Sequence, residues 1–240
     1  ISANGRTLAV SGADIDGSNS RGNVRVLDFD DAQNAWVQRG QTFIGVEADV
    51  DATAASLSSD GQTLAIGARF DSCGPIGASG TVKIYDFDGS AWLQRGDTIC
   101  GANNSWSGST VVLSSDGQTV AFGAPFAIGT NGSGRPGHVR AFHYNDNGST
   151  WVELGTAIEG VGASDNMGSA ISLSSDGYTL AVGSALYDGP QTNSGQVRVF
   201  DFVANAWAQR GTAIDGVLSN KGFAEEVALS GDGSTVAIGI

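Results

Sequence analysis

The chain has 240 residues, enough for a substantial hydrophobic core, and its 36 glycines with only 4 prolines are typical of a turn-rich all-β protein rather than a disordered one. Its 25 acidic and 12 basic residues give a formal net charge of −13, which argues against nucleic acid or an anionic membrane as a partner. No stretch has the length of a membrane helix, so no membrane insertion is expected. No signal peptide is visible, and because the chain does not start with Met, prior removal of a leader is compatible with the sequence.

The first predicted element is a hairpin that recurs along the whole chain. Residues 57–68 read LSSDGQTLAIGA and residues 113–124 read LSSDGQTVAFGA, which is two apolar runs around an Asp-Gly turn. Such a turn requires positive φ at its centre, which Asn and Gly tolerate best. The turn dipeptides of five copies are spaced by 56, 56, 60 and 56 residues and start at Asn4, Asp60, Asp116, Asp176 and Asp232. A period of this length predicts a repeat architecture.

The second predicted element is an aromatic-rich hairpin with the same period. In one copy it reads VKIYDFDGSAWLQRG, with alternating apolar residues, a polar turn at 88–90 and a strand that contains Trp. The tryptophans of the four copies are spaced by 56, 59 and 56 residues and are Trp36, Trp92, Trp151 and Trp207. Two hairpins per repeat predict a four-stranded antiparallel sheet, since no stretch shows a helical period.

The repeats predict an all-β fold, a β-propeller of four-stranded antiparallel blades with four and a half repeats of about 56 residues. A single such sheet cannot bury both faces, so the blades must stack, with small residues such as Ala65 and Gly67 allowing close approach near the axis. We expect one repeat domain over 1–240, with units at approximately 1–52, 53–108, 109–168 and 169–224 and a half unit at 225–240. The half unit favours a piece of a longer chain, with completion by a neighbouring subunit as the alternative.

The chain resembles the FG-GAP repeats of integrin α-subunit heads and of secreted bacterial and algal proteins. The resemblance rests on the run AFGAP at 121–125 and on the repeated Ala-Ile/Val-Gly-Ala ending, and it covers essentially the whole chain. Calcium-binding members of that family have an Asp-x-Asp-x-Asp-Gly-x-x-Asp loop of alternating carboxylates. The matching loop at 58–63 keeps one carboxylate, Asp60, which we interpret as a turn residue. Calcium is therefore implied by the family only, and no metal ligands and no cofactor are expected.

The two cysteines and three sequons indicate an extracellular, secreted or cell-surface protein. Cys73 lies in a predicted loop between the second and third strands of one unit and Cys100 at the end of its fourth strand, which places both on one face. A disulfide here would close a loop of roughly 27 residues and stabilise the fold by about 3 kcal/mol, with two unrelated buried thiols as the alternative. Candidate glycosylation sites in predicted loops are Asn103, Asn131 and Asn147.

The loops that differ between repeats are the candidates for function, since the repeated positions serve packing. The loops between second and third strands and the linkers between units share one face of the propeller. Candidate binding residues on this face for a sugar or a cation-dependent ligand are Asp14, Asp16, Glu47, Asp49, Asp51 and Trp106. The alternative is a solvated loop face without a ligand.

No catalytic constellation stands out, so no catalytic residues and no enzyme activity are expected. The only histidines, His138 and His143, are interpreted as surface residues. The tripeptide at 95–97, Arg-Gly-Asp, resembles an adhesion signal, but Gln-Arg-Gly recurs at other repeats. Its arginine is therefore assigned to the scaffold, where it and its equivalents Arg39 and Arg210 pair with acidic or aromatic neighbours.

The sequence favours a non-catalytic extracellular scaffold, adhesion or structural assembly module that acts through protein partners, self-assembly or glycans. The alternative is a carbohydrate-binding or carbohydrate-processing propeller that uses the loop face. A cluster of carboxylates beside Trp106 would favour this alternative.

Overall fold

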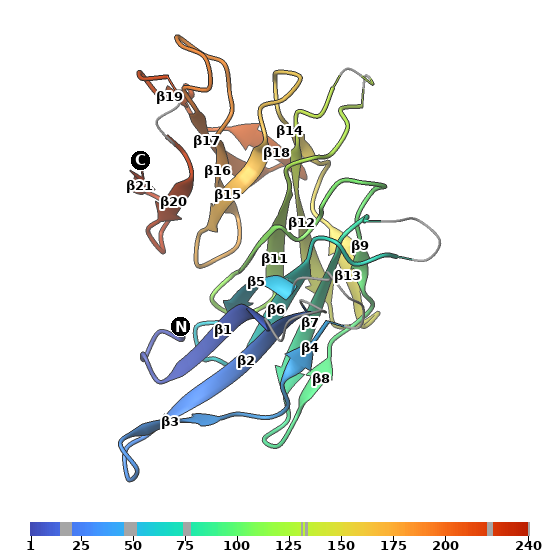
Figure 1. The fold of residues 1–240 in the computed structure, drawn as a ribbon, viewed down its shortest axis with the longest axis vertical. Helices are drawn as coiled ribbons and strands as arrows, with labels where there is room; N and C mark the ends of the chain where they lie inside the picture. The colour runs from blue at the N-terminus through green and yellow to red at the C-terminus, as the bar shows by residue number, and fades with distance from the viewer. Residues whose placement is uncertain are drawn as a thin grey trace.

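The computed structural model describes residues 1–14, 21–45, 52–73, 78–130, 132, 134–219 and 223–239 (Figure 1). These residues form strands, turns and bends and no helix, so none of them belongs to a helix that could cross a membrane. The all-β fold class predicted from the hairpin repeats is confirmed. In Figure 1 the sheets follow one another around a curve, from the blue strands at the bottom to the red hairpin at the upper left.

The described strands form four successive antiparallel sheets and a final hairpin. The first sheet contains β1 (Thr7–Asp14), β2 (Arg21–Asp30), β3 (Ala35–Gln38) and β4 (Phe43–Ile44). The second contains β5 (Ala52–Leu57), β6 (Thr63–Ala68), β7 (Thr81–Phe87), β8 (Trp92–Gln94) and β9 (Ile99–Cys100). The third contains β10 (Thr110–Leu113), β11 (Thr119–Ala124), β12 (His138–Asn145), β13 (Thr150–Glu153) and β14 (Ile158–Glu159). The fourth contains β15 (Met167–Leu173), β16 (Thr179–Ser184), β17 (Gln196–Val203), β18 (Ala206–Gln209) and β19 (Ile214–Asp215), and the hairpin contains β20 (Glu226–Leu229) and β21 (Val236–Gly239).

The outer strand of each sheet is divided, which the sequence did not predict. In the second sheet, β8 pairs with the end of β7 at Phe87 and Trp92, and β9 pairs with its beginning at Thr81 and Cys100. The Gln-Arg-Gly tail lies between the two pieces. Its glycine, Gly96, has φ +69°, a left-handed conformation that interrupts a strand. The tail is therefore free to contact the next sheet.

The inner strands lie next to one another around a central channel. Strands β5, β10, β15 and β20, together with β1, line a hollow of about 420 Å³. Gly67 of β6 shows how closely neighbouring units approach, because a Cβ there would collide with the carbonyl oxygen of Gly108 in the linker just before the third sheet. The expected role of the small residues near the axis is thus a contact between neighbouring sheets.

The hydrophobic core consists of clusters between adjacent sheets, as expected for stacked blades. Val24 and Val26 of the first sheet share a cluster with Leu64 and Trp92 of the second. A second cluster joins Ile84 to aromatic residues of the third sheet, and a third joins the third and fourth sheets. These fully buried side chains account for the repeated apolar positions in the sequence.

The Asp-Gly turn is held by hydrogen bonds of its own side chains. The Ser58 hydroxyl donates to Asp60 Oδ1 at 2.6 Å, and the backbone N–H groups of Gln62 and Thr63 donate to Asp60 Oδ1 and Ser58 Oγ at 2.9 Å each. The interpretation of Asp60 as a turn residue is confirmed. The same bonds recur at Asp116, Asp176 and Asp232.

A chain of backbone hydrogen bonds connects these turns from one sheet to the next. Ser59 N–H donates to the Ser115 carbonyl at 2.8 Å, and Ser115 N–H donates to the Ser175 carbonyl at 3.0 Å. The series also includes Ala3 to Ser59 and Ser175 to Gly231, both at 2.8 Å. Each junction between sheets therefore has one bond of this series.

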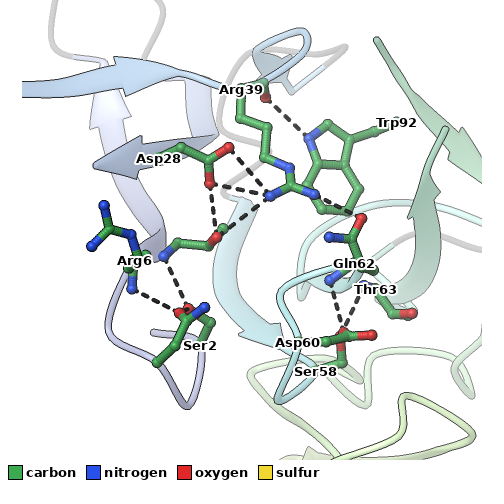
Figure 2. Close-up of polar contacts among 11 residues, drawn as sticks. Ser2, Arg6, Asp28, Arg39, Ser58, Asp60, Gln62, Thr63 and Trp92 are labelled. Atoms are coloured by element: carbon green, nitrogen blue, oxygen red, sulfur yellow. Dashed lines mark hydrogen bonds and ion pairs between the residues drawn. The ribbon is translucent and has the colours of Figure 1, made fainter. Parts of the chain in front are cut away.

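The arginine of the Gln-Arg-Gly tail joins two sheets, as Figure 2 shows for Arg39. Its guanidinium donates to Asp28 of the first sheet at 3.1 Å and to Gln62 of the second at 2.8 Å. Its carbonyl accepts from Trp92 Nε1 at 3.1 Å. The guanidinium lies 4.1 Å from the Phe87 ring centroid. Arg95 and Arg210 make corresponding ion pairs. The expectation that these arginines pair with acidic or aromatic neighbours is confirmed: all three pair with aspartates, and Arg39 and Arg95 also lie over aromatic rings.

Candidate functional site

The variable loops and linkers meet at one end of the sheets. Phe126 N–H, in the loop after β11, donates to the carbonyl of Ser105 in the preceding linker at 3.3 Å, and Leu186 N–H makes the same bond to Asp165 at 3.2 Å. We call this end the loop face. It comprises the described parts of 69–80, 101–109, 125–137, 160–166, 185–195 and 216–224.

The predicted disulfide between Cys73 and Cys100 is present, with the Cα atoms 5.8 Å apart. It ties the loop after β6 to β9 on the loop face. The Cys100 carbonyl also accepts from Arg140 Nη1 of the third sheet at 3.3 Å. The cross-linked loop is thus connected to the neighbouring sheet.

Several candidate residues on the loop face lie outside the described residues. These are Asp16, Glu47, Asp49 and Asp51 among the binding candidates and Asn131 among the glycosylation candidates. Asp14 ends β1, and its side chain is not described. Asn103 and Asn147 are exposed in turns, so their glycosylation remains a prediction.

Trp106 is half-buried in a group of aromatic side chains. Its ring centroid lies 5.0 Å from that of Phe70 and 4.0 Å from that of Phe126, and the Arg69 guanidinium lies 5.7 Å from it. Trp106 has φ +56°, which is unusual for a bulky residue. Its contacts fill the space between two loops of the second and third sheets.

Where the third and fourth sheets meet, the loop face contains a pocket of about 420 Å³. This volume lies in the range of roughly 300–1,000 Å³ that is common for small-molecule sites. Asn166, with φ +59°, stands here at the repeat position of Trp106. The pocket is lined by the linker before β15 and the loop after β16, through Val161, Gly162, Ala163, Ser164, Asp165, Leu186, Tyr187, Asp188 and Asn193.

Asp165 shapes the linker wall of the pocket. It is only 4% exposed, and its Oδ2 accepts the N–H groups of Val161 at 2.8 Å and Gly162 at 2.6 Å. The Arg198 guanidinium lies within its electrostatic reach. Burial lowers the pKa of Arg198, and the attraction of Asp165 opposes that shift. The Arg198 guanidinium and the Asp165 carboxylate therefore attract each other.

The opposite wall combines apolar and polar groups. Tyr187 is half-buried, and the Asp188 carboxylate accepts Asn193 N–H at 2.7 Å. Leu186 on this wall is 46% exposed, and Val161 on the linker wall is 70% exposed. The arrangement can therefore bind a small molecule that has both hydroxyl groups and an apolar surface. Sequence reasoning selected acidic residues and Trp106 and missed Tyr187 and Asn193, although the combination of Tyr, Asp and Asn in one variable loop is visible in the sequence.

His138 is less exposed than the sequence suggested. Its Nε2 is buried and has no hydrogen-bond partner in the described residues. Burial, with the nearby positive charge of Arg140, lowers its pKa to about 4. The interpretation of His138 as a surface residue is therefore wrong. His143 Nδ1 lies 3.1 Å from the Thr119 hydroxyl. No group of three or more His, Cys, Asp or Glu residues that could hold a metal ion occurs in the described ranges.

The Arg-Gly-Asp tripeptide belongs largely to the junction between the second and third sheets. The Arg95 side chain is only 10% exposed, and its carbonyl accepts from Trp151 Nε1 at 2.9 Å. A Cβ at Gly96 would lie 3.0 Å from Trp151 Cδ1, so the backbone packs directly on that ring. Only Asp97 is exposed, which agrees with a scaffold role for Arg95.

Comparisons with known proteins identify the fold. No family model matches the chain, and no curated protein matches its sequence. Among solved structures, the chain is similar to hydrazine synthase of Kuenenia stuttgartiensis, with TM-score 0.60, 15% identity and coverage of 99% of this chain and 69% of that one. It is also similar to the periplasmic gluconolactonase PpgL of Pseudomonas aeruginosa, with TM-score 0.61, 19% identity and coverage of 99% and 63%. A third similar structure is the β-propeller domain of Cps50 (Swd1) of Myceliophteria thermophila, with TM-score 0.56, 10% identity and coverage of 95% and 61%.

The fold is a β-propeller. At these identities the likeness shows the fold alone, and the chain spans only 61–69% of the length of these structures. The expectation that the chain is not an enzyme is corrected by the same comparison, because a synthase and a lactonase are built on this fold. Regular packing positions in a repeat therefore do not exclude catalysis.

Proposed function

We propose that the chain is an extracellular β-propeller that binds carbohydrate in the loop-face pocket, with the blades as its scaffold. The observation that carries the proposal is the pocket of about 420 Å³ in which Tyr187 adjoins Asp188 and Asn193. An aromatic ring offers a flat apolar surface to the C–H face of a sugar. Carboxylate and amide groups can accept and donate hydrogen bonds to its hydroxyl groups.

Two further observations support an extracellular glycan-binding or adhesion module of FG-GAP type. The Cys73–Cys100 disulfide suits an oxidising compartment, and one similar structure is a periplasmic protein. The AFGAP run at 121–125 supports the relation to FG-GAP repeats. Attachment to glycans through a loop face would give such a scaffold its adhesive role.

A glycan array followed by titration calorimetry tests the proposal. The disulfide-intact chain is expected to bind one or more glycans, and Tyr187→Ala and Asp188→Ala are each expected to weaken binding about tenfold or more, as for central contacts of a binding site. Tyr178→Ala is the matched control, because Tyr178 is a 41% exposed tyrosine of the same sheet at the opposite end of β16. Its affinity should equal that of the unmodified chain. Absence of any glycan binding, or equal binding by all three variants, would refute the proposal.

A further inference from the structure

We infer that the pocket selects an uncharged pyranose that bears a methyl group, as an N-acetyl or a 6-deoxy substituent; this inference rests on the proposed function. The first reason is the pair of aliphatic side chains on its walls. Val161 is 70% exposed and Leu186 is 46% exposed, and both line the same hollow. A sugar with hydroxyl groups alone would leave these side chains without an apolar partner.

The size of the expected preference follows from burial of one methyl group. Transfer of one such group from water to an apolar contact is worth about 0.8 kcal/mol, or roughly fourfold in affinity. Contact with two aliphatic side chains lets the ligand bury the methyl group on more than one side. The preference is therefore expected at about fourfold or somewhat above.

The polar wall accounts for the sugar ring itself. The Asp188 carboxylate has about four acceptor positions, of which Asn193 N–H occupies one. A carboxylate accepts but does not donate, so it suits ring hydroxyl groups that donate. Tyr187 is half-buried and lines the same pocket, so its ring is the candidate surface for one face of the sugar.

The charge of the pocket accounts for the exclusion of acidic sugars. Asp165 has Arg198 as its neighbouring cation, whereas the ion pairs of the described residues include none for Asp188. The chain as a whole has a formal charge of −13. A uronate or sulfated ring would therefore place its negative charge against a carboxylate, an arrangement that discriminates strongly against the wrong ligand.

Titration calorimetry with four methyl glycosides tests the inference. The probes are methyl glucoside and three analogues that share its anomeric methyl group, namely the N-acetylglucosamine glycoside, the 6-deoxy glycoside and the glucuronide; the methyl-bearing sugars are those with the additional N-acetyl or 6-deoxy methyl group. The N-acetyl or the 6-deoxy compound should bind at least about fourfold more tightly than the glucoside. Comparison of these two compounds identifies which methyl group is recognised. The glucuronide should bind about tenfold or more weakly than the glucoside.

Two variants and a control locate the preference. Val161→Ser and Leu186→Ser should each reduce the advantage of the methyl-bearing sugar while glucoside affinity stays within about twofold. Ile128→Ser is the control, since Ile128 is 55% exposed on the loop after β11 and does not line the pocket. Equal affinity for glucoside and methyl-bearing sugars, or tighter binding of the glucuronide, would overturn the inference and leave the proposed function standing. Failure of all four probes and of the glycan array would overturn both.

Discussion

The junctions between neighbouring sheets are alike in their backbone contacts, and one of them differs from the rest in an ion pair. At the first two junctions an arginine pairs with an aspartate of its own sheet, Arg39 with Asp28 at 3.1 Å and Arg95 with Asp86 at 3.6 Å. Arg210 pairs with Asp201 at the junction with the final hairpin. Between the third and fourth sheets, the corresponding residues are His143 and Leu154. At this junction the aspartate and the arginine of the ion pair are therefore both replaced.

The hydrogen bond from the tryptophan Nε1 to a backbone carbonyl is present at all three of these junctions, with or without the ion pair. Trp207 Nε1 donates to the Leu154 carbonyl at 2.9 Å, as Trp92 and Trp151 donate to the carbonyls of Arg39 and Arg95. The Leu154 side chain packs into the cluster that includes Trp207. A partly exposed ion pair contributes little net stability, so an apolar contact can replace it if both charges are removed. The loop end of this same junction contains the pocket.

The largest expected effect comes from the shared tryptophan contact. Trp151→Ala should reduce the free energy of unfolding by about 3–5 kcal/mol, because it removes a large buried side chain and leaves the Arg95 carbonyl without its donor. Trp151 is 8% exposed, whereas Trp36 of the first sheet is 41% exposed and is the matched control. Urea unfolding followed by circular dichroism measures both. Equal losses for Trp36→Ala and Trp151→Ala would show that the junction is not the source of the stability.

The turn glycines test the second shared contact. Gly117 has φ +68°, and a Cβ there would lie 2.8 Å from Thr63 Cβ in the preceding sheet. Gly5 has φ +70° and no atom within 4 Å of such a Cβ. Gly5→Ala should therefore cost only the left-handed conformation, about 1–2 kcal/mol, and Gly117→Ala should cost about 1 kcal/mol more. Thermal unfolding of the two variants separates backbone strain from the collision, and identical costs would rule the collision out.

Comparison of these contacts with the sequence shows what a repeat pattern can predict. The Asp-Gly turns, the order of strands, the role of Asp60 and the Cys73–Cys100 disulfide follow from local rules and from the repeat, which fixes the topology of every unit at once. The division of the outer strand and the pocket do not. The two N–H groups that Asp165 accepts come from its own linker and are local, but the pocket also depends on the distance between two loops, which is not local. Its residues are also those that the repeat does not share.

The third sheet has a histidine, His138, where the other sheets have no titratable side chain, and this predicts that the free energy of unfolding depends on pH. The folded pKa is about 4, below the ordinary value of 6.5, so the unfolded chain binds a proton between these limits and the folded chain does not. This contribution to stability is complete above pH 6.5 and is lost as the pH falls towards 4, by about 2 kcal/mol. The fourth sheet has Gln196 at the same position, so His138→Gln is the natural variant. Its urea midpoint should change less between pH 7 and pH 4.5, and an unchanged slope would contradict this assignment.

The smallest expected effect tests the exchanged pair itself by a double-mutant cycle. Leu154→Arg alone should destabilise, because it places a guanidinium beside His143 and the Trp207 cluster without the aspartate present at the other junctions. His143→Asp alone should also destabilise, since the carboxylate gains the Thr119 hydroxyl but no cation. The double variant restores both charges, and the interaction energy from urea unfolding at pH 7 should favour it by about 1 kcal/mol. The reverse pair, Asp86→His with Arg95→Leu, should show coupling of the same sign at the second junction. Additive effects at both junctions would mean that the two positions changed independently and that packing around each tryptophan, rather than charge, decides which residues the junction accepts.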